Sequence, residues 1–194
     1  MSQRKALIVV DVQPTFCEGG ELGVEGGNDC AAAIAEFFAA HGDEYDYVAT
    51  TQDWHIKPGA HFSQTPDFVD SWPPHGVAGT PNAELHPLIK ALGIAHHFKK
   101  GEYAAAYSGF EGHDEKNEDV SLDEALVAEG IDALDVVGIA ESHCVKQTAL
   151  DGVANGYDVR VFTDLTVPVS EELGELARRE MARAGVELVE SSQV

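Results

Sequence analysis

The chain has 194 residues, and 12 Lys and Arg residues against 34 Asp and Glu residues give a formal net charge of −22. This length suits one full hydrophobic core, so residues 1–194 are predicted to form a single domain. A charge this negative repels phosphate backbones and anionic lipid headgroups, which argues against nucleic acid and membrane partners.

Short apolar runs rich in β-branched residues alternate with helical patterns along the chain. In chain order the pattern predicts strand Ala6–Val12, helix Asp29–Ala40, strands Tyr47–Thr51 and Ala95–Phe98, helix Ser121–Glu129, strand Leu134–Ile139, helix Ser142–Asn155, strand Val159–Thr163, helix Ser170–Ala184 and strand Val186–Val189. This alternation predicts an α/β fold, with a mostly parallel six-stranded sheet and helices on both faces in a Rossmann-like three-layer arrangement.

Two segments lack such a pattern. Asp53 to Pro87 has little periodicity and holds most of the prolines, but its aromatic residues argue against disorder, so a functional loop is expected. Gly112 to Val120 is polar and is expected to be a surface loop.

The cellular location is predicted from the N-terminus and the cysteines. The apolar run Ala6–Val10 is too short for a signal peptide, and no segment approaches the length of a membrane span. Three cysteines, Cys17, Cys30 and Cys144, are an odd number without paired spacing, which favours a reducing compartment over a disulfide framework. We therefore predict a cytoplasmic protein.

Reactive side chains end or follow four of the predicted strands. They are Asp11, Asp53, His55, Lys99, Lys100 and Cys144. Ligands of an open α/β sheet bind beyond the carboxyl ends of its strands, so these residues are expected to meet at one edge of the sheet.

A metal site is the first interpretation of the long loop. Asp53, His55, His61 and His75 offer one carboxylate and three imidazoles, a set that suits one divalent ion, Zn, Fe or Mn. The spacing is not that of a zinc finger, and histidines in loops are commonly surface residues, so the alternative is a solvent-exposed group.

Cys144 is a candidate nucleophile. A lone cysteine on a helix behind a strand is usually a small buried hydrophobe. With Ser142 as the helix N-cap, however, Cys144 would lie in the first turn, where backbone N–H groups stabilise a thiolate and an oxyanion.

Two further groups are candidates for controlling this thiol. Asp11 is either a turn residue at a strand end or a partly desolvated carboxylate suited to proton transfer. Lys100 is either a solvated charge, as a lysine beside another lysine usually is, or an ammonium that keeps the acid and the thiol in a reactive charge state. Strand alternation alone does not choose between Lys99 and Lys100.

The motifs appear in an order typical of one family. The stretches are Ala6–Gln13, Phe16–Gly20, Asp53–His55, Pro58–Gly59, His61–Phe62, Ser71–His75, Lys100–Gly101, Tyr107–Gly112, Val136–Ala140 and His143–Val145. With them the chain resembles, from about Ala6 to Ser192, the nicotinamidase/pyrazinamidase group of the isochorismatase-like cysteine hydrolases.

The resemblance implies roles for particular residues. It implies a catalytic triad of Asp11, Lys100 and Cys144, and it selects Lys100 over Lys99 because Lys100 precedes the glycine of the motif. It also implies a cis peptide between Ile139 and Ala140 that directs the Ala140 N–H toward an oxyanion beside the N–H of Cys144. The implied ring pocket consists of Phe16, Trp72 and Tyr107. The implied metal ligands are Asp53, His55, His61 and His75.

The activity implied by the resemblance is hydrolysis of nicotinamide to nicotinic acid and ammonia through a cysteine thioester. Pyrazinamide is an expected second substrate, one divalent metal ion an expected cofactor, and salvage of pyridine nucleotides (NAD) the expected role. A homo-oligomer is one option for the assembly. The chain departs from the family at Glu141-Ser142, where Thr-Asp is frequent, but Ser142 is still expected to cap the helix.

Three rival functions share some of these residues. A sister amidohydrolase acting on another small amide or carbamoyl compound would keep the triad. A metal hydrolase that activates water would leave Cys144 structural. A non-catalytic metal-binding or interaction domain would have inherited the residues at the sheet edge without using them for catalysis.

Overall fold

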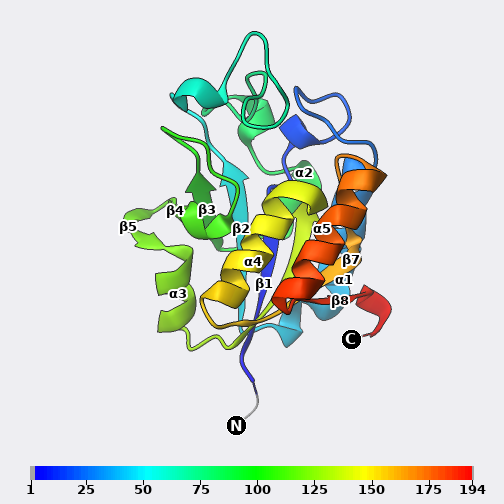
Figure 1. Ribbon diagram of the computed structural model, residues 1–194. Coiled ribbons are helices and arrows are strands. Elements are labelled where there is room, and N and C mark those ends of the chain that lie inside the picture. The colour runs from blue at the N-terminus through cyan, green and yellow to red at the C-terminus, as the bar shows by residue number, and fades with distance from the viewer. Residues whose placement is uncertain (1–2, 194) are drawn as a thin grey trace.

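The structure is a computed structural model that describes residues 3–193, so residues 1, 2 and 194 of the predicted domain lie outside the described residues. In this part of the chain an eight-stranded sheet has the order β5-β4-β3-β2-β1-β6-β7-β8 (Figure 1). The strands are β1 (Lys5–Val10), β2 (Tyr47–Asp53), β3 (His96–Lys100), β4 (His113–Asp114), β5 (Asn117–Ser121), β6 (Ala133–Ile139), β7 (Asp158–Val167) and β8 (Glu187–Val189). Neighbouring strands are parallel along the part of the sheet with the order β3-β2-β1-β6-β7-β8. At the other edge, β4 pairs antiparallel with β3, and β5 pairs antiparallel with β4.

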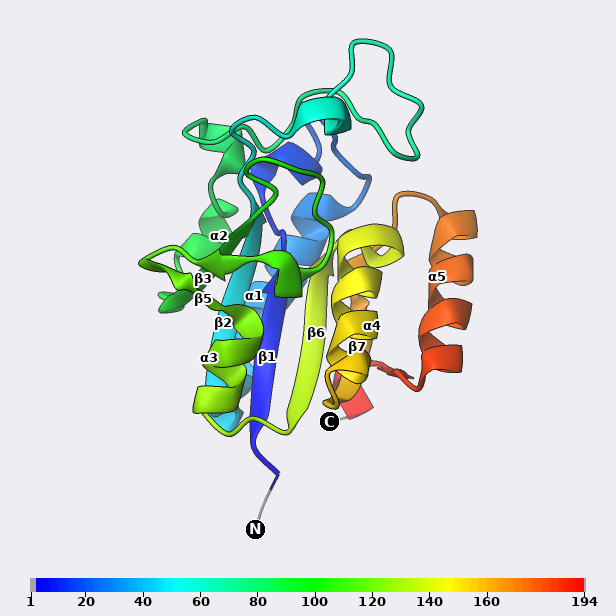
Figure 2. The same cartoon turned by 60° about the vertical axis from the view of Figure 1, so that its left-hand side comes forward.

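Helices cover both faces of the sheet (Figure 2). They are α1 (Gly27–His41), α2 (Pro87–Lys90), α3 (Leu122–Ala128), α4 (Lys146–Ala154) and α5 (Glu171–Ala184), and a π-helical turn at Glu141–Val145 leads directly into α4. Side chains of α3, α4 and α5 pack in one core layer, and those of α1 and α2 pack in the other. None of the helices in residues 3–193 has the combined length and apolarity that crossing a bilayer requires.

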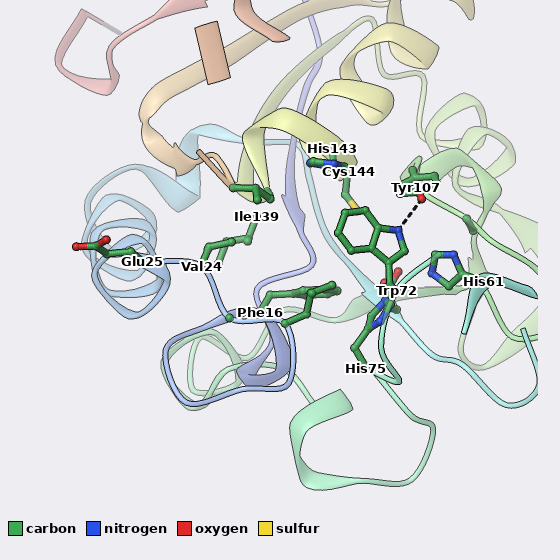
Figure 3. A pocket seen from close by; sticks show the side chains of 16 residues that line it. Phe16, Val24, Glu25, His61, Trp72, His75, Tyr107, Ile139, His143 and Cys144 are labelled. Carbon is green, nitrogen blue, oxygen red and sulfur yellow. Dashed lines mark hydrogen bonds and ion pairs between the residues drawn. The ribbon is translucent and has the colours of Figure 1, made fainter. Parts of the chain in front are cut away.

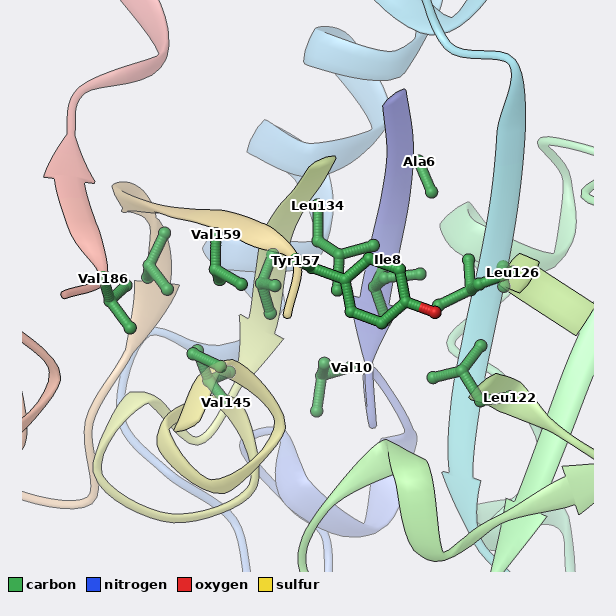
Figure 4. Close-up of a cluster of buried hydrophobic side chains, with 14 of the residues drawn as sticks. Ala6, Ile8, Val10, Leu122, Leu126, Leu134, Val145, Tyr157, Val159 and Val186 are labelled. Carbon is green, nitrogen blue, oxygen red and sulfur yellow. The ribbon is translucent and has the colours of Figure 1, made fainter. Parts of the chain in front are cut away.

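The central strand β1 explains why the sheet has two core layers. Its side chains alternate, because Ala6, Ile8 and Val10 belong to the layer under α3 and α4, while Leu7 and Val9 belong to the layer under α1. Figure 4 shows the first set among side chains of the neighbouring elements. Burying each branched side chain contributes about 1.5–3 kcal/mol, so a register slip would be costly on both faces.

The predicted α/β class is confirmed, and each predicted strand and helix has a counterpart within a few residues. The expected surface loop at Gly112–Val120 is wrong, because this segment forms the hairpin β4–β5 and raises the number of strands from six to eight. Backbone N–H groups of Lys116 and Asn117 donate to Asp114 Oδ1 in its turn, at 2.8 and 3.1 Å. Polar residues suit such a hairpin because it extends the sheet at a solvated edge.

The long segment between β2 and α2 is ordered. Isolated bridges join His55 to Val77 and Phe62 to Trp72. In Figures 1 and 2 this segment lies over the carboxyl ends of the central strands. Since β3, β2, β1 and β6 are consecutive neighbours in the sheet, the residues at their carboxyl ends meet beneath it.

Candidate active site

Four elements bring the predicted acid, ammonium and thiol together. Asp11 directly follows β1, Asp53 and Lys100 are the last residues of β2 and β3, and Cys144 lies in the π-helical turn after β6. Each of the four residues is buried, with exposed fractions of 0%, 3%, 1% and 8%.

Lys100 is the centre of this group. Its Nζ lies 2.8 Å from Asp11 Oδ2 and 3.7 Å from Cys144 Sγ, and it also contacts Asp53 Oδ1. The Thr51 hydroxyl donates to the other oxygen of Asp11 at 2.7 Å. One ammonium therefore joins both carboxylates and the thiol.

The charges of the group depend on one another. Burial alone would lower the pKa of Lys100, but the carboxylates of Asp11 and Asp53 outweigh it and hold this pKa well above its ordinary value. Burial would raise the pKa of Asp53, yet the Lys100 ammonium holds it well below its usual range. Burial raises the pKa of Asp11, and it raises the pKa of Cys144 well above its ordinary value. The charge of Lys100 opposes both shifts. The result is a protonated thiol beside a carboxylate of increased basicity.

The three loop histidines are buried together, which is inconsistent with the alternative of a solvent-exposed group. One ring nitrogen of each of His55, His61 and His75 lies within 4.8 Å of the others. His55 Nδ1–H donates to the Gly101 carbonyl at 2.6 Å, and His75 Nδ1–H donates to the Pro73 carbonyl at 2.8 Å. The Nε2 atoms of His55 and His75 therefore face Asp53 Oδ2, at distances of 3.3 and 3.5 Å.

This arrangement fits a divalent metal ion. Backbone carbonyls that fix the outer nitrogen of an imidazole are typical supports of metal-binding histidines. Nδ1 of His61 is buried and has no hydrogen-bond partner among residues 3–193. Burial, followed by the neighbouring histidines, lowers the pKa of His61 to about 4, so its ring is neutral, as a ligand must be. One carboxylate and three imidazoles suit zinc, iron or manganese.

A pocket of about 150 Å³ opens beside the thiol. A cavity of roughly this volume accommodates one six-membered aromatic ring. Its lining includes all three predicted ring-pocket residues, Phe16, Trp72 and Tyr107, together with Cys144 and two of the histidines (Figure 3). The Trp72 indole N–H donates to the Tyr107 hydroxyl at 3.0 Å, which fixes the two rings relative to each other.

The turn that carries Cys144 differs from the expected helix start. Ser142 is not an N-cap, because the turn is π-helical and begins after Ala140, and the Ser142 hydroxyl instead accepts the Val169 N–H at 3.1 Å. The same hydroxyl lies 2.9 Å from His143 Nδ1. The peptide between Ile139 and Ala140 is cis, and both residues line the pocket with Cys144.

Sequence reasoning assigned no role to three residues that support the site. Gln13 binds the backbone of Asp53, donating to its carbonyl and accepting its N–H, both at 2.9 Å. Thr51 supports Asp11, and His143 lines the pocket with a pKa lowered by burial. Position directly after or within a strand at this edge was the available signal for Gln13 and Thr51.

The fold and the site define a class: an α/β protein with an acid, an ammonium and a thiol at the carboxyl edge of a parallel sheet, beside a metal-type histidine group. Residues 5–193 match the Isochorismatase domain family, and the chain belongs to that family.

Similar proteins cover almost the whole chain. A nicotinamidase/pyrazinamidase of Mycobacterium tuberculosis is 52% identical over 188 residues, which are 97% of this chain and 100% of the relative. The structure of the pyrazinamidase of Pyrococcus horikoshii in complex with zinc is 30% identical with a TM-score of 0.80, over 96% and 99% of the two chains. PnC1 from L. infantum in complex with nicotinate is 31% identical with a TM-score of 0.82, over 99% and 95% of the two chains.

Proposed function

We propose that this protein hydrolyses nicotinamide to nicotinic acid and ammonia, through a thioester on Cys144, and that it also accepts pyrazinamide. The observation that carries the proposal is the contact of Lys100 with both Asp11 and Cys144 at a pocket of one-ring size. The relative named nicotinamidase/pyrazinamidase and the neighbour in complex with nicotinate support the same substrate.

Asp11 acts as the base of the first step. Its carboxylate takes the Sγ proton of Cys144, and the thiolate attacks the carboxamide carbon of the substrate. Burial raises the pKa of Asp11, which makes the carboxylate a stronger proton acceptor, while Lys100 keeps the charge of the group compensated.

The tetrahedral intermediate then collapses. The backbone N–H groups of Ala140 and Cys144, both at the pocket wall, are the proposed donors to its oxyanion. Asp11 returns the proton to the amine, ammonia leaves, and a nicotinoyl thioester remains on Cys144. Asp11 next takes a proton from water, whose oxygen attacks the thioester. The C–S bond breaks, Asp11 returns the proton to the Cys144 sulfur, and the products are nicotinic acid and the free thiol.

The pocket supplies orientation. Phe16, Trp72 and Tyr107 offer aromatic surface to a pyridine or pyrazine ring, and the apolar lining excludes bulk water from the reacting carbonyl. We propose that Asp53, His55, His61 and His75 would hold the metal, and a divalent ion there would supply Lewis acidity beside the substrate ring.

The wider role follows from this activity. We propose that residues 1–194 act as one domain in pyridine nucleotide salvage in the cytoplasm, with homo-oligomerisation open to a mass measurement in solution. The partner is a small molecule rather than a nucleic acid or a membrane, which accords with the net charge of −22.

The test is ammonia release from nicotinamide and pyrazinamide by the purified protein, before and after chelation, with Cys144→Ala alongside. Acid-quenched wild type should carry the nicotinoyl adduct by mass spectrometry, and Cys144→Ala should carry none. Cys30→Ala is the matched control, because Cys30 is a second buried thiol that lies in the α1 core layer.

Each outcome discriminates between functions. Loss of turnover with both chelation and Cys144→Ala supports the proposal. Turnover that survives Cys144→Ala would instead indicate a metal hydrolase, and no turnover by metal-replete wild type would indicate another small amide as substrate.

A further inference from the structure

Glu141 is a buried charge that the reaction above does not use. It is 0% exposed and is the first residue of the turn that carries Cys144. Arg178 Nη1 of α5 donates to its Oε1 at 2.8 Å, and the Thr166 hydroxyl of β7 donates to its Oε2 at 2.9 Å. The carboxylate therefore joins the turn to two other elements.

The helix α5 approaches this carboxylate closely. A Cβ at Gly174 would lie 3.1 Å from Glu141 Oε1 and 2.9 Å from Pro168, so only glycine leaves room for the contact. Arg178 also donates to Glu171 at 2.7 Å, but Glu171 is exposed, and such surface pairs contribute little. The inner contact with Glu141 is thus the one that orders the arginine.

The next residue makes a second connection to the same region. The Ser142 hydroxyl accepts the N–H of Val169, which lies between β7 and α5 and lines the pocket. Glu141 and Ser142 together attach the turn of the nucleophile to the segment that forms one pocket wall.

Stability alone does not account for such a pair. Burial raises the pKa of Glu141, with Thr166 and Arg178 opposing the shift. The Arg178 side chain is 28% exposed, so the desolvation falls mainly on the carboxylate and offsets much of the attraction. Such a pair contributes little net stability even though removing one partner is costly. What the pair does supply is a fixed geometry between its elements.

We propose that Glu141 is a positioning residue: its carboxylate, held by Arg178 and Thr166, fixes the turn that carries Cys144 relative to the pocket wall. The proposal rests on the proposed function, because it assigns Glu141 a part in placing the thiol and the Ala140 N–H against the bound amide.

The test compares Glu141→Gln, Arg178→Met and the double variant in steady-state assays with nicotinamide. A displacement of about 1 Å at a reacting group can lower the rate roughly hundredfold. Each single variant should therefore lower kcat by about tenfold to hundredfold, with KM within about threefold of wild type. The double variant should resemble the single ones, because both remove the same interaction. Arg178→Lys should recover part of kcat.

The chain offers a matched control at the other end of β6. Asp135 is 2% exposed and accepts from Arg160 Nε and Nη2 and from the Tyr45 hydroxyl, each at 2.7 Å, so it is also a buried carboxylate held by one arginine and one hydroxyl. Asp135→Asn should lower the melting temperature about as much as Glu141→Gln while keeping kcat within twofold. An equal loss of kcat in Asp135→Asn, or unchanged kcat in Glu141→Gln, would overturn the proposal.

A second readout separates this proposal from the substrate assignment. The rate at which iodoacetamide alkylates Cys144, followed by peptide mapping, needs no knowledge of the substrate. Glu141→Gln should change this rate at least about threefold, whereas Asp135→Asn and Glu171→Gln should not. If wild type fails to hydrolyse nicotinamide but this pattern is found, the substrate is wrong and the positioning role stands; an unchanged alkylation rate refutes the positioning role.

Discussion

Gly101→Ala tests the link between a backbone turn and the histidine group. Gly101 follows Lys100, has φ +78°, and accepts the Nδ1–H of His55 on its carbonyl at 2.6 Å. A Cβ here would lie 2.5 Å from His55 Cε1 and 2.8 Å from Nδ1. Since carbon atoms pack at about 3.5 Å or more, the imidazole must retreat by about 1 Å.

Gly79→Ala is the matched control. Gly79 has the same φ, +78°, but a Cβ there would meet no atom within 4 Å. Both substitutions carry the strain of a left-handed residue, about 1–2 kcal/mol, and only Gly101→Ala displaces a proposed ligand. Disturbing the support of a metal-binding histidine typically weakens metal affinity about 10–100-fold.

Zinc-dependent stability gives the readout. At a zinc concentration of 100 times the wild-type Kd, binding adds about 2.7 kcal/mol to the free energy of unfolding. A 30-fold weaker Kd would reduce this gain to about 0.9 kcal/mol in Gly101→Ala, with Gly79→Ala unaffected. Thermal melts with and without zinc, together with a chelator competition titration, measure the difference. Equal zinc affinities of the two variants would refute the reasoning.

Other predictions concern the pocket, the base and the remaining thiols. Tyr107→Phe leaves the Trp72 indole N–H without its acceptor. Since a hydrogen bond contributes roughly 1 kcal/mol, this variant should raise KM about fivefold and keep kcat within twofold of wild type. A steady-state assay in which kcat falls and KM is unchanged would contradict this prediction. Asp11→Asn should lower kcat at least about 10²-fold, because it removes the proton acceptor, while metal analysis finds wild-type content; near-normal turnover would exclude Asp11 as the base. Burial raises the pKa of Cys17 to about 11 and of Cys30 to about 12, from an ordinary value of 9.0. The neutral thiols therefore contribute stability that is fully present below about pH 9 and is lost as the pH rises through these values. Between about pH 8 and pH 12, the urea concentration at the midpoint of unfolding should fall less in the double variant Cys17→Ala, Cys30→Ala than in wild type. Parallel pH profiles of the two proteins would contradict this prediction.

Burial on both faces made the central strands predictable from sequence. The run from Ala6 to Val10 is apolar at every position because alternate residues enter two different core layers. Local capping signals were equally informative, since Ser121 forms a capping box with Glu124 at the start of α3.

The edge hairpin was not predictable by the same reasoning. The residues of β4 and β5 are half-buried or exposed, and all except Val120 are polar, so no apolar period indicates a strand. β4 is placed instead by antiparallel pairing with β3, a contact between distant segments.

Part of the site followed from position along the strands. The rule that ligands bind at the carboxyl edge brought Asp11, Asp53 and Cys144 into one group. It did not separate the two lysines, and only the family resemblance chose Lys100. In the structure the Lys99 ammonium lies 3.7 Å from the centroid of the Trp54 ring, while Lys100 is buried among the carboxylates.

The contacts of Glu141 lay outside any local pattern. Arg178 is 37 residues further along the chain, and nothing in the periodicity of α5 indicates that its guanidinium turns inward. The π-helical turn likewise replaced the expected cap at Ser142, because the hydroxyl binds Val169 from a distant loop rather than the helix start.

The site residues at the ends of β1, β2 and β3 and after β6 belong to four consecutive strands in the middle of the sheet. Central strands open to solvent only when the whole domain unfolds, whereas loops and edges open far more readily. Amide hydrogens of Val10 and Phe98 should accordingly exchange at the global unfolding rate, and those of the β4–β5 hairpin much sooner. The proposed nucleophile and its proposed base thus share the lifetime of the native state, so urea should abolish catalysis and the far-ultraviolet circular dichroism signal at one midpoint.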